Sequence, residues 1–175
     1  MAQQELVVLV NEADEVIGSM EKMQAHVEGK LHRAFSVFVF NSKGEMLIHQ
    51  RALSKYHSPG LWTNTCCSHP RPNESYHDGA IRRLMEEMGM SCDLEPAFHF
   101  IYKCTFDNDL IEHELDHVFT GVSDVEPLPN KLEVHTWKYK AVEDLLNDIK
   151  QNPELYTPWF KICLQKHSEK LLARA

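Results

Sequence analysis

The apolar and polar positions of this 175-residue chain predict strands, then a helix, then more strands and two closing helices. The clearest segment is residues 32–40, HRAFSVFVF, whose near-continuous apolar run predicts a strand buried on both faces. Residues 6–10 and 16–20 are β-branched runs on either side of a turn, which predicts an opening hairpin. The turn sequence NSKG at 41–44 predicts that residues 45–51 return as the partner strand of 32–40.

The remaining segments alternate in a way that is typical of a sheet flanked by helices. Helices are predicted over residues 75–88, 142–149 and 158–172, and a helical turn or loop over 21–26. In the first helix Ile81, Leu84, Met85 and Met88 fall at i, i+3, i+4 and i+7, which predicts one apolar face. Gly89 is a suitable C-terminal end for that helix, and Gly29 for the helical turn.

Four further strands are predicted over residues 62–69, 95–106, 111–122 and 134–139, with a turn at 107–109 and a proline loop at 127–129. The segment 111–122 carries Ile111, Leu115 and Phe119 on one face and Glu112, Glu114 and Asp116 on the other. This order predicts an α+β fold, an α/β sandwich with a mixed sheet under helices. The length predicts a single domain spanning residues 1–175.

Composition narrows the class of protein. The 43% hydrophobic and 25% charged residues are ordinary for a globular chain. A formal charge of −8 argues against non-specific nucleic-acid binding, and no apolar run approaches the roughly 20 residues that cross a bilayer. Five cysteines without a recognisable secretory signal predict reduced thiols and a cytoplasmic location. Eleven histidines are many for this length and suggest a metal site.

Candidate chemistry concentrates in WTNTCCSHP, residues 62–70. In an extended strand Cys67 and His69, two residues apart, lie on the same face, so a possible acid or nucleophile stands beside a possible metal ligand. Pro70 and Pro72 prevent this strand from continuing. The plainer interpretation of Cys67 is a small buried hydrophobe, and this interpretation suits Cys66 better.

The helix over 75–88 and its lead-in resemble the Nudix box, G-x5-E-x7-R-E-U-x-E-E-x-G-U, in which U is a bulky apolar residue. Glu74, seven further residues and the run RRLMEEMGM at 82–90 fit most of it. Glu86 and Glu87 would offer carboxylates to a hard cation such as magnesium, and Arg82–Glu86 and Arg83–Glu87 are i,i+4 pairs. The plainer alternative is an amphipathic surface helix.

Two positions depart from this pattern. Ser68 stands where the first glycine should be, and Arg83 replaces the first glutamate of the R-E-U core. In Nudix hydrolases that glutamate belongs to the metal cluster that activates water, so its loss argues against hydrolysis. An arginine at this position would instead bind a diphosphate bidentately.

Several segments together resemble type I isopentenyl-diphosphate isomerase over roughly residues 20–165: HRAFS at 32–36, QRALSK at 50–55, LWTNTCCSHP at 61–70, the altered box, and Glu112-His113-Glu114. The resemblance implies a Nudix-like fold and an enzyme of isoprenoid biosynthesis. Its activity would interconvert isopentenyl and dimethylallyl diphosphate by protonation and deprotonation through a carbocation-like intermediate.

The resemblance also implies one divalent metal, zinc, manganese or magnesium, held by His26, His32, His69, Glu112 and Glu114. The assignment of His26 depends on the loop register. A magnesium ion would join the substrate diphosphate to Glu87. The plainer alternative treats the Glu112–Asp116 stripe as the solvated face of an edge strand, and the other histidines as surface or hydrogen-bonded residues: His49, His57, His77, His99, His113, His117, His135 and His167.

For the substrate, the resemblance implies four diphosphate-binding cations, Lys22, Arg51, Lys55 and Arg83. Cys67 and Glu114 would move the two protons, with Tyr102 bonded near Glu114. Trp159 would be an aromatic wall beside developing positive charge, or merely core packing. Lys22 and Lys55 alternatively are solvated surface groups.

The expected partner is therefore a small allylic or homoallylic diphosphate, with no nucleic acid, no membrane, and a monomer or weak homo-oligomer. Two competing functions remain open from the residues alone. One is a Nudix-type diphosphohydrolase that uses Glu86 and Glu87, against which Arg83 argues. The other is a zinc-stabilised binding domain, in which chelation would unfold the protein and Cys67→Ala would be harmless.

Overall fold

The centre of the fold is a parallel pair of long strands. The computed structural model describes residues 5–106 and 108–173. Strand β3 (His32–Phe40) pairs with β8 (Ile111–Val122) over its whole length, from His32 opposite Glu114 to Phe40 opposite Val122. Every residue of β3 except Arg33 is buried, which confirms the strand predicted from its apolar run.

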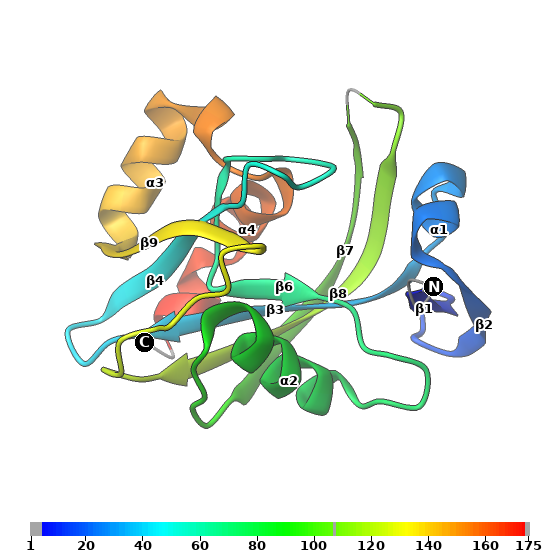
Figure 1. The fold of residues 1–175 in the computed structure, drawn as a ribbon, viewed down its shortest axis with the longest axis horizontal. Coiled ribbons are helices and arrows are strands. Elements are labelled where there is room, and N and C mark those ends of the chain that lie inside the picture. Colours follow the sequence, from blue (N-terminus) through cyan, green and yellow to red (C-terminus); the bar gives the residue numbers. More distant parts are fainter. Residues whose placement is uncertain (1–4, 107, 174–175) are drawn as a thin grey trace.

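The other strands extend this centre in two directions (Figure 1). The antiparallel partners are β7 (Glu95–Thr105) on β8, and β6 (Cys66–Ser68) on β3. The hairpin of β1 (Leu6–Val10) and β2 (Val16–Glu21) joins β3 at Leu9 opposite His32. This hairpin confirms the prediction for the start of the chain.

Strand β4 (Glu45–Arg51) departs from the prediction. It was expected to pair with β3, but their register contains only Phe40 opposite Met46. Along its whole length β4 pairs instead with β9 (Val134–Ala141), and β5 (Trp62–Thr63) pairs with its far end. The reason is that β4 turns away from β3 directly after the hairpin turn, so the backbone groups of β4 bond to a strand about 90 residues later in the chain.

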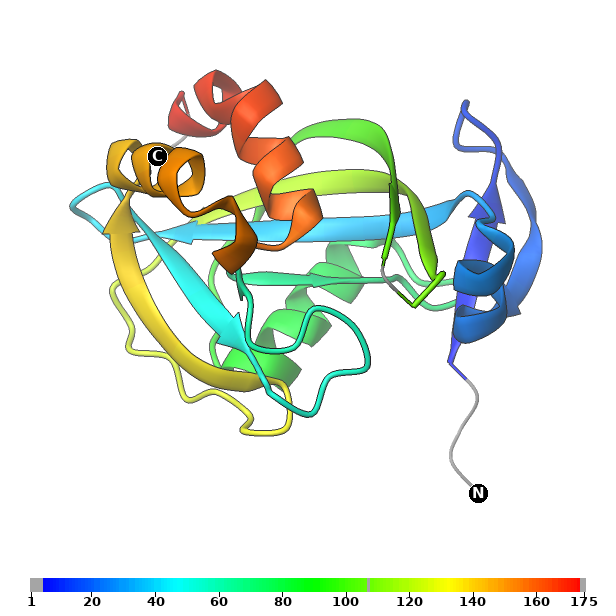
Figure 2. The same ribbon diagram turned by 90° about the horizontal axis from the view of Figure 1, so that it is seen from above.

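Helices cover both faces of the sheet, which confirms the predicted α+β sandwich (Figure 2). Helix α2 (Tyr76–Met88) packs on one face, over a core that includes Phe35, Val37 and Leu84. Helices α3 (Val142–Gln151) and α4 (Pro158–Leu172), joined by the short 3-10 helix η1 (Pro153–Leu155), cover the other face. Helix α1 (Lys22–Glu28) ends at Gly29 beside the opening hairpin. Among the described residues, no helix combines the length and apolar character required to cross a bilayer.

Helix α2 begins and ends as predicted, but its buried face differs. The Ser75 side chain accepts a hydrogen bond from the Asp78 backbone N–H, and Gly89 ends the helix in the left-handed conformation. Leu84 and Met88 are fully buried, whereas Ile81 is 38% exposed and Met85 is 50% exposed. Ala80 and the charged Glu87 pack inward instead. The buried residues of the helix are Gly79, Ala80, Leu84, Glu87 and Met88. The predicted apolar stripe was therefore half wrong, because part of this helix faces a polar cavity.

The segment 62–70 is less regular than the single strand predicted for it. Two short strands, β5 and β6, replace it, and His69 follows the second. The predicted turn at 107–109 includes residue 107, which lies outside the described residues. Glu112, Glu114 and Asp116 lie on the central strand β8 and are at most 6% exposed, so the alternative of a solvated edge strand is wrong.

Gly89 is a position where no side chain fits. Its φ is +61°, and a Cβ placed on it would lie 2.2 Å from the carbonyl oxygen of Leu128. We expect Gly89→Ala to lower the free energy of unfolding by about 3 kcal/mol, since overpacking adds to the left-handed backbone cost. Gly44→Ala is the control, because its φ is +76° and nothing lies within 4 Å of the added Cβ. The control should lose only about 1 kcal/mol in urea denaturation, and equal losses would contradict the clash.

Candidate active site

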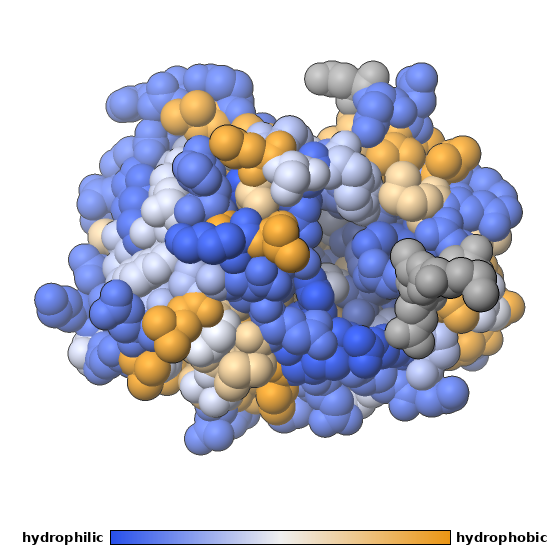
Figure 3. All heavy atoms as spheres, viewed as in Figure 1, coloured by the Kyte–Doolittle hydropathy of each residue, from blue (hydrophilic) through white to orange (hydrophobic). Residues whose placement is uncertain are grey.

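A cavity of about 550 Å³ opens on the face seen in Figure 1, and Figure 3 shows this face hollowed among hydrophilic residues. Its volume is in the usual range for small-molecule sites. The structure brings together in this cavity nearly all the residues predicted for the site: Lys22, Arg51, Lys55, Cys67, His69, Arg83, Glu87, Tyr102, Glu112, Glu114 and Trp159. His26 and His32 are buried directly beside His69, with ring centroids 5.9 and 5.0 Å from its own.

Three histidines and one glutamate form a compact group at the inner end of the cavity. One ligand atom from each of His26, His32, His69 and Glu114 lies within 4.8 Å of the others, so this group could hold a metal ion. The β3–β8 register sets His32 opposite Glu114, and β6 delivers His69 to the same face. Nitrogen and carboxylate donors of this kind suit zinc, manganese or magnesium.

The hydrogen bonds of the histidines favour this use. Nδ1 of His32 donates to the carbonyl oxygen of Lys30 at 2.8 Å, which leaves the Nε2 lone pair facing Glu114 at 3.5 Å. Neither ring nitrogen of His26 has a hydrogen-bond partner among the described residues, although the side chain is buried. Burial and the nearby His69 lower the pKa of His26 to about 3, so this ring is neutral and can offer a lone pair.

Two neighbouring carboxylates on β8 differ in environment. Tyr102 on β7 donates its hydroxyl to Oε2 of Glu114 at 2.6 Å and lies 3.1 Å from Oε2 of Glu112. Burial acts to raise the pKa of Glu114, but the neighbouring His32 and His69 hold it well below its ordinary value. Burial and the charge of Glu114 raise the pKa of Glu112 well above its ordinary value. The two carboxylates are therefore shifted in opposite directions, and Glu114 is the more readily ionised of the two. Glu112 lies beside the four-residue group rather than within it.

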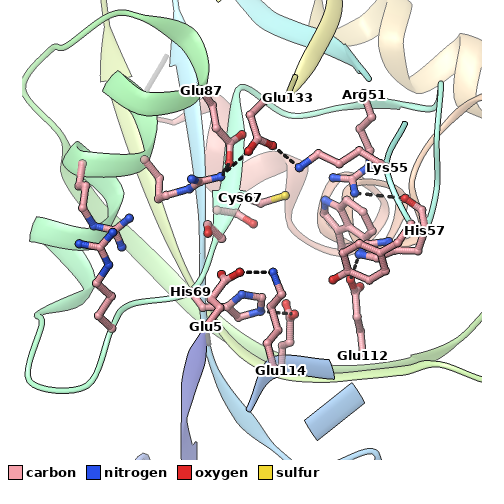
Figure 4. A pocket seen from close by; sticks show the side chains of 18 of the residues that line it. Glu5, Arg51, Lys55, His57, Cys67, His69, Glu87, Glu112, Glu114 and Glu133 are labelled. Carbon is pink, nitrogen blue, oxygen red and sulfur yellow. Dashed lines mark hydrogen bonds and ion pairs between the residues drawn. The ribbon is translucent and has the colours of Figure 1, made fainter. Parts of the chain in front are cut away.

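Cys67 lies in the same cavity as Glu114. Strand β6 pairs with β3 so that Cys67 is opposite Ser36, and Figure 4 shows its sulfur between Glu87 and Glu133 on one side and His69 and Glu114 on the other. Burial raises the pKa of the Cys67 thiol well above its ordinary value, despite the opposing effect of Arg51. The sulfur therefore carries its proton at neutral pH, which suits proton transfer better than thiolate attack.

Three of the cations lie with Glu87 and Glu133, at the end of the cavity away from His69 and Glu114 (Figure 4). Lys55 pairs with Glu133, and Arg83 pairs with Glu87 and lies 3.4 Å from Glu133 (Figure 4). Arg51 donates to the carbonyl oxygens of Ser58 and His57. The three cations are therefore held on separate elements by groups that an incoming anion can replace. Lys22 pairs with Glu5 at the cavity edge.

Glu133 is a residue that the sequence analysis missed. It joins Lys55 and Arg83 from the connection between β8 and β9, and its carbonyl oxygen accepts from the Ala52 backbone N–H at 2.9 Å. Its only sequence signal is one acidic residue just before a strand, in KLEVHTW, and nothing in that pattern distinguishes it from a surface glutamate.

Two aromatic rings, those of Trp159 and His57, form part of the cavity wall. Trp159 on α4 is 4% exposed and donates its indole N–H to Thr63 Oγ1 at 3.0 Å, which fixes the ring. His57 lies beside it, with ring centroids 5.8 Å apart. His57 was predicted to be a surface or hydrogen-bonded residue. A surface location is wrong, because the residue is 8% exposed and lines the cavity. The connection between β4 and β5 folds inward here, which residue types alone do not indicate.

Comparison with known proteins gives the family. The model of the NUDIX domain matches residues 30–160. Isopentenyl-diphosphate Delta-isomerase 2 of Aromatoleum aromaticum is 50% identical over 160 residues, which cover 91% of this chain and 85% of the relative. Isopentenyl-diphosphate Delta-isomerase of Burkholderia multivorans is 47% identical over 171 residues, which cover 98% and 97%.

Solved structures agree with this at the level of fold. A Deinococcus radiodurans protein superimposes with a TM-score of 0.79 at 22% identity, covering 93% of this chain and 98% of the other. The MutT protein of Methanosarcina mazei gives a TM-score of 0.67 at 17% identity, covering 81% and 95%. These two structural similarities show the fold alone. The two isomerases, in contrast, match this chain at about 50% sequence identity over nearly its whole length. The chain is thus built on a NUDIX domain and belongs to the isopentenyl-diphosphate Delta-isomerase family.

Proposed function

We propose that this protein interconverts isopentenyl diphosphate and dimethylallyl diphosphate, in isoprenoid biosynthesis, by proton transfer within the cavity described above. The observation that carries the proposal is the sharing of one cavity by the Cys67 thiol, the Glu114 carboxylate and a separate end lined with cations. A substrate with an anionic head and a short apolar tail matches such a division, because the head needs the cations and the tail needs the proton-transfer groups.

The reaction moves a double bond by one carbon. A proton added to the terminal methylene carbon leaves positive charge on the branched carbon, and loss of a proton from the adjacent methylene forms the new double bond. Cys67 and Glu114 are the pair that handles these protons: one gives a proton while the other takes one, and the reverse reaction exchanges the roles. Tyr102, bonded to Glu114 at 2.6 Å, is placed to steady its charge.

The intermediate requires a site that tolerates positive charge and excludes water. The indole of Trp159 is a large π-face at the cavity wall and is not a nucleophile, so it can stabilise the cation without trapping it. Lys22, Arg51, Lys55 and Arg83 bind the diphosphate oxygens, and Arg83 offers a planar fork for two of them. Glu133 and Glu5 release these cations when the substrate arrives.

His26, His32, His69, Glu114 and the adjacent Glu112 would hold a divalent manganese, zinc or magnesium ion, which supplies a fixed positive charge that tunes the acidity of Glu114. Glu87 would hold a magnesium ion that accompanies the diphosphate. The whole chain works as one catalytic domain, as a monomer or weak homo-oligomer, since one chain supplies every group named here. A thiol that must stay reduced places it in the cytoplasm.

Proton NMR in deuterated water tests this function. With isopentenyl diphosphate and manganese, magnesium or zinc, we expect dimethylallyl diphosphate to form and deuterium to enter both product and recovered substrate. Isomerisation without deuterium entry would contradict proton exchange through the cavity. A chelator should abolish turnover while circular dichroism stays unchanged, whereas unfolding on chelation would favour the structural-zinc alternative.

The hydrolase alternative has its own measurement. Arg83 occupies the place of a Nudix-box glutamate and pairs with Glu87, so one of the carboxylates that would bind metal for hydrolysis is replaced by a cation. We expect no phosphate release from nucleoside diphosphates or dinucleotides. Rapid metal-dependent hydrolysis would favour the diphosphohydrolase instead.

A further inference from the structure

His57 is a buried residue of the cavity to which the reaction above gives no role. It lies in the connection between β4 and β5 and is 8% exposed. Its ring packs against Phe106 at 5.0 Å and against Trp159 at 5.8 Å between centroids, and lies 6.3 Å from the ring of His26. It therefore stands between the aromatic wall and the histidine group.

The two ring nitrogens of His57 have different surroundings. Nε2 lies 3.4 Å from Oε1 of Glu112, slightly beyond the usual range of an N–H···O hydrogen bond, so a small movement of either side chain would form one. Nδ1 is buried and has no hydrogen-bond partner among the residues that the structure describes. A proton on Nε2 points at a carboxylate oxygen, whereas a proton on Nδ1 would be buried without an acceptor.

Glu112 is thereby enclosed from two sides. Tyr102 contacts its Oε2 at 3.1 Å and also donates to Glu114, so Glu112 is linked through one phenol to the group that could hold a metal. His57 contacts the other oxygen. Donors around a carboxylate of this kind fix its orientation and commonly change metal affinity 10- to 100-fold when removed.

We propose that His57 is a positioning residue that donates its Nε2–H to Glu112 and so holds this carboxylate beside His26, His32, His69 and Glu114, which raises the affinity of the group for a divalent cation. The inference rests on the metal site of the proposed function and is independent of the substrate. His57 touches no reacting atom in this arrangement, and its effect is exerted through Glu112.

The test measures manganese binding by calorimetry, on the full chain treated with chelator and without substrate. His57→Phe keeps an aromatic ring against Phe106 and Trp159 but removes the donor, and should weaken Mn²⁺ binding about 10- to 100-fold. His57→Gln keeps an N–H donor but loses the ring, and should recover most of the affinity. His167→Phe, at a half-buried histidine of α4 that packs against Phe98, is the matched control and should bind as the unmodified chain does.

The opposite pattern overturns the proposal. If His57 serves only packing, phenylalanine will be harmless to Mn²⁺ affinity, and glutamine will lower thermal stability instead. Equal loss of Mn²⁺ affinity in both variants also overturns the proposal, because the N–H donor that glutamine retains would then bring no benefit. Failure of the unmodified chain to bind Mn²⁺ likewise overturns it.

A double-mutant cycle supplies a second measurement if phenylalanine impairs folding. His57→Leu, which removes the donor without adding a large ring, should lower Mn²⁺ affinity in the unmodified chain but not in a Glu112→Gln background, because the carboxylate that His57 would position is then gone. Additive effects overturn the proposal. A chain that binds Mn²⁺ with this dependence on His57 but leaves isopentenyl diphosphate unchanged would refute the proposed function and not the role of His57.

Discussion

Replacing Cys67 with alanine is expected to lower kcat/KM for isopentenyl diphosphate by at least about 10³-fold, because it removes one of two proton-transfer groups. The Cys67 sulfur lies in the cavity, and burial keeps the proton on it. The alanine side chain has no proton to transfer. Binding of inorganic diphosphate should change less than about threefold, since the cations belong to other residues. NMR measures the turnover, and calorimetry measures the binding.

Cys104→Ala is the matched control for this variant. Its thiol is half-buried on β7, and the residue does not line the cavity. We expect normal turnover and the same melting temperature as the unmodified chain. If Cys67→Ala retained more than about a tenth of the activity, Cys67 would be a packing residue and the proton would have to come from elsewhere.

Glu114→Gln is expected to have an effect at least as large, with about 10³- to 10⁴-fold lower turnover. The substitution keeps the shape of the side chain but removes the charge and the capacity to accept a proton. It also replaces one of the two oxygens, which face His69 at 3.0 Å and Tyr102 at 2.6 Å, with an amide NH₂ group that cannot accept a hydrogen bond. Excess manganese should therefore not restore activity, and deuterium should not enter the substrate in deuterated water.

Two comparisons separate this role from simple loss of metal. Glu112→Gln changes the neighbouring carboxylate, so its activity should recover in part when manganese is raised. Glu95→Gln, on the exposed start of β7, should leave both turnover and metal affinity unchanged. Full recovery of Glu114→Gln in excess metal would reduce Glu114 to a ligand and leave the second proton-transfer group unidentified.

Local patterns predicted the elements that depend on local physics. The apolar run of β3 and the Ser75 and Gly89 ends of α2 were correct because burial on both faces and capping are properties of adjacent residues. The pairing of β4 with β9 was missed because it joins segments about 90 residues apart. Likewise, Ile81 and Met85 remain exposed because α2 packs inward with Ala80 and Glu87 in their place, a rotation of the helix that its own periodicity does not determine.

The site residues divide in the same way, into those that local spacing predicts and those that depend on tertiary contacts. Cys67 and His69 could be placed on one wall from their spacing, and the other predicted site residues came from resemblance to a family, which the structure then brought together around one cavity. His57 and Glu133 were missed because both lie in connections, whose path depends on tertiary contacts rather than on periodicity.

The side chains at the two ends of the cavity are carried on different kinds of backbone. Glu114, Tyr102 and the thiol are carried on mutually paired strands, whereas Lys55 and Glu133 are carried on connections. Backbone in a ladder resists displacement, and irregular backbone accommodates insertions and substitutions. Related sequences can therefore change which anionic group they bind without changing the proton-transfer residues. Substrate preference and reaction type can then evolve separately.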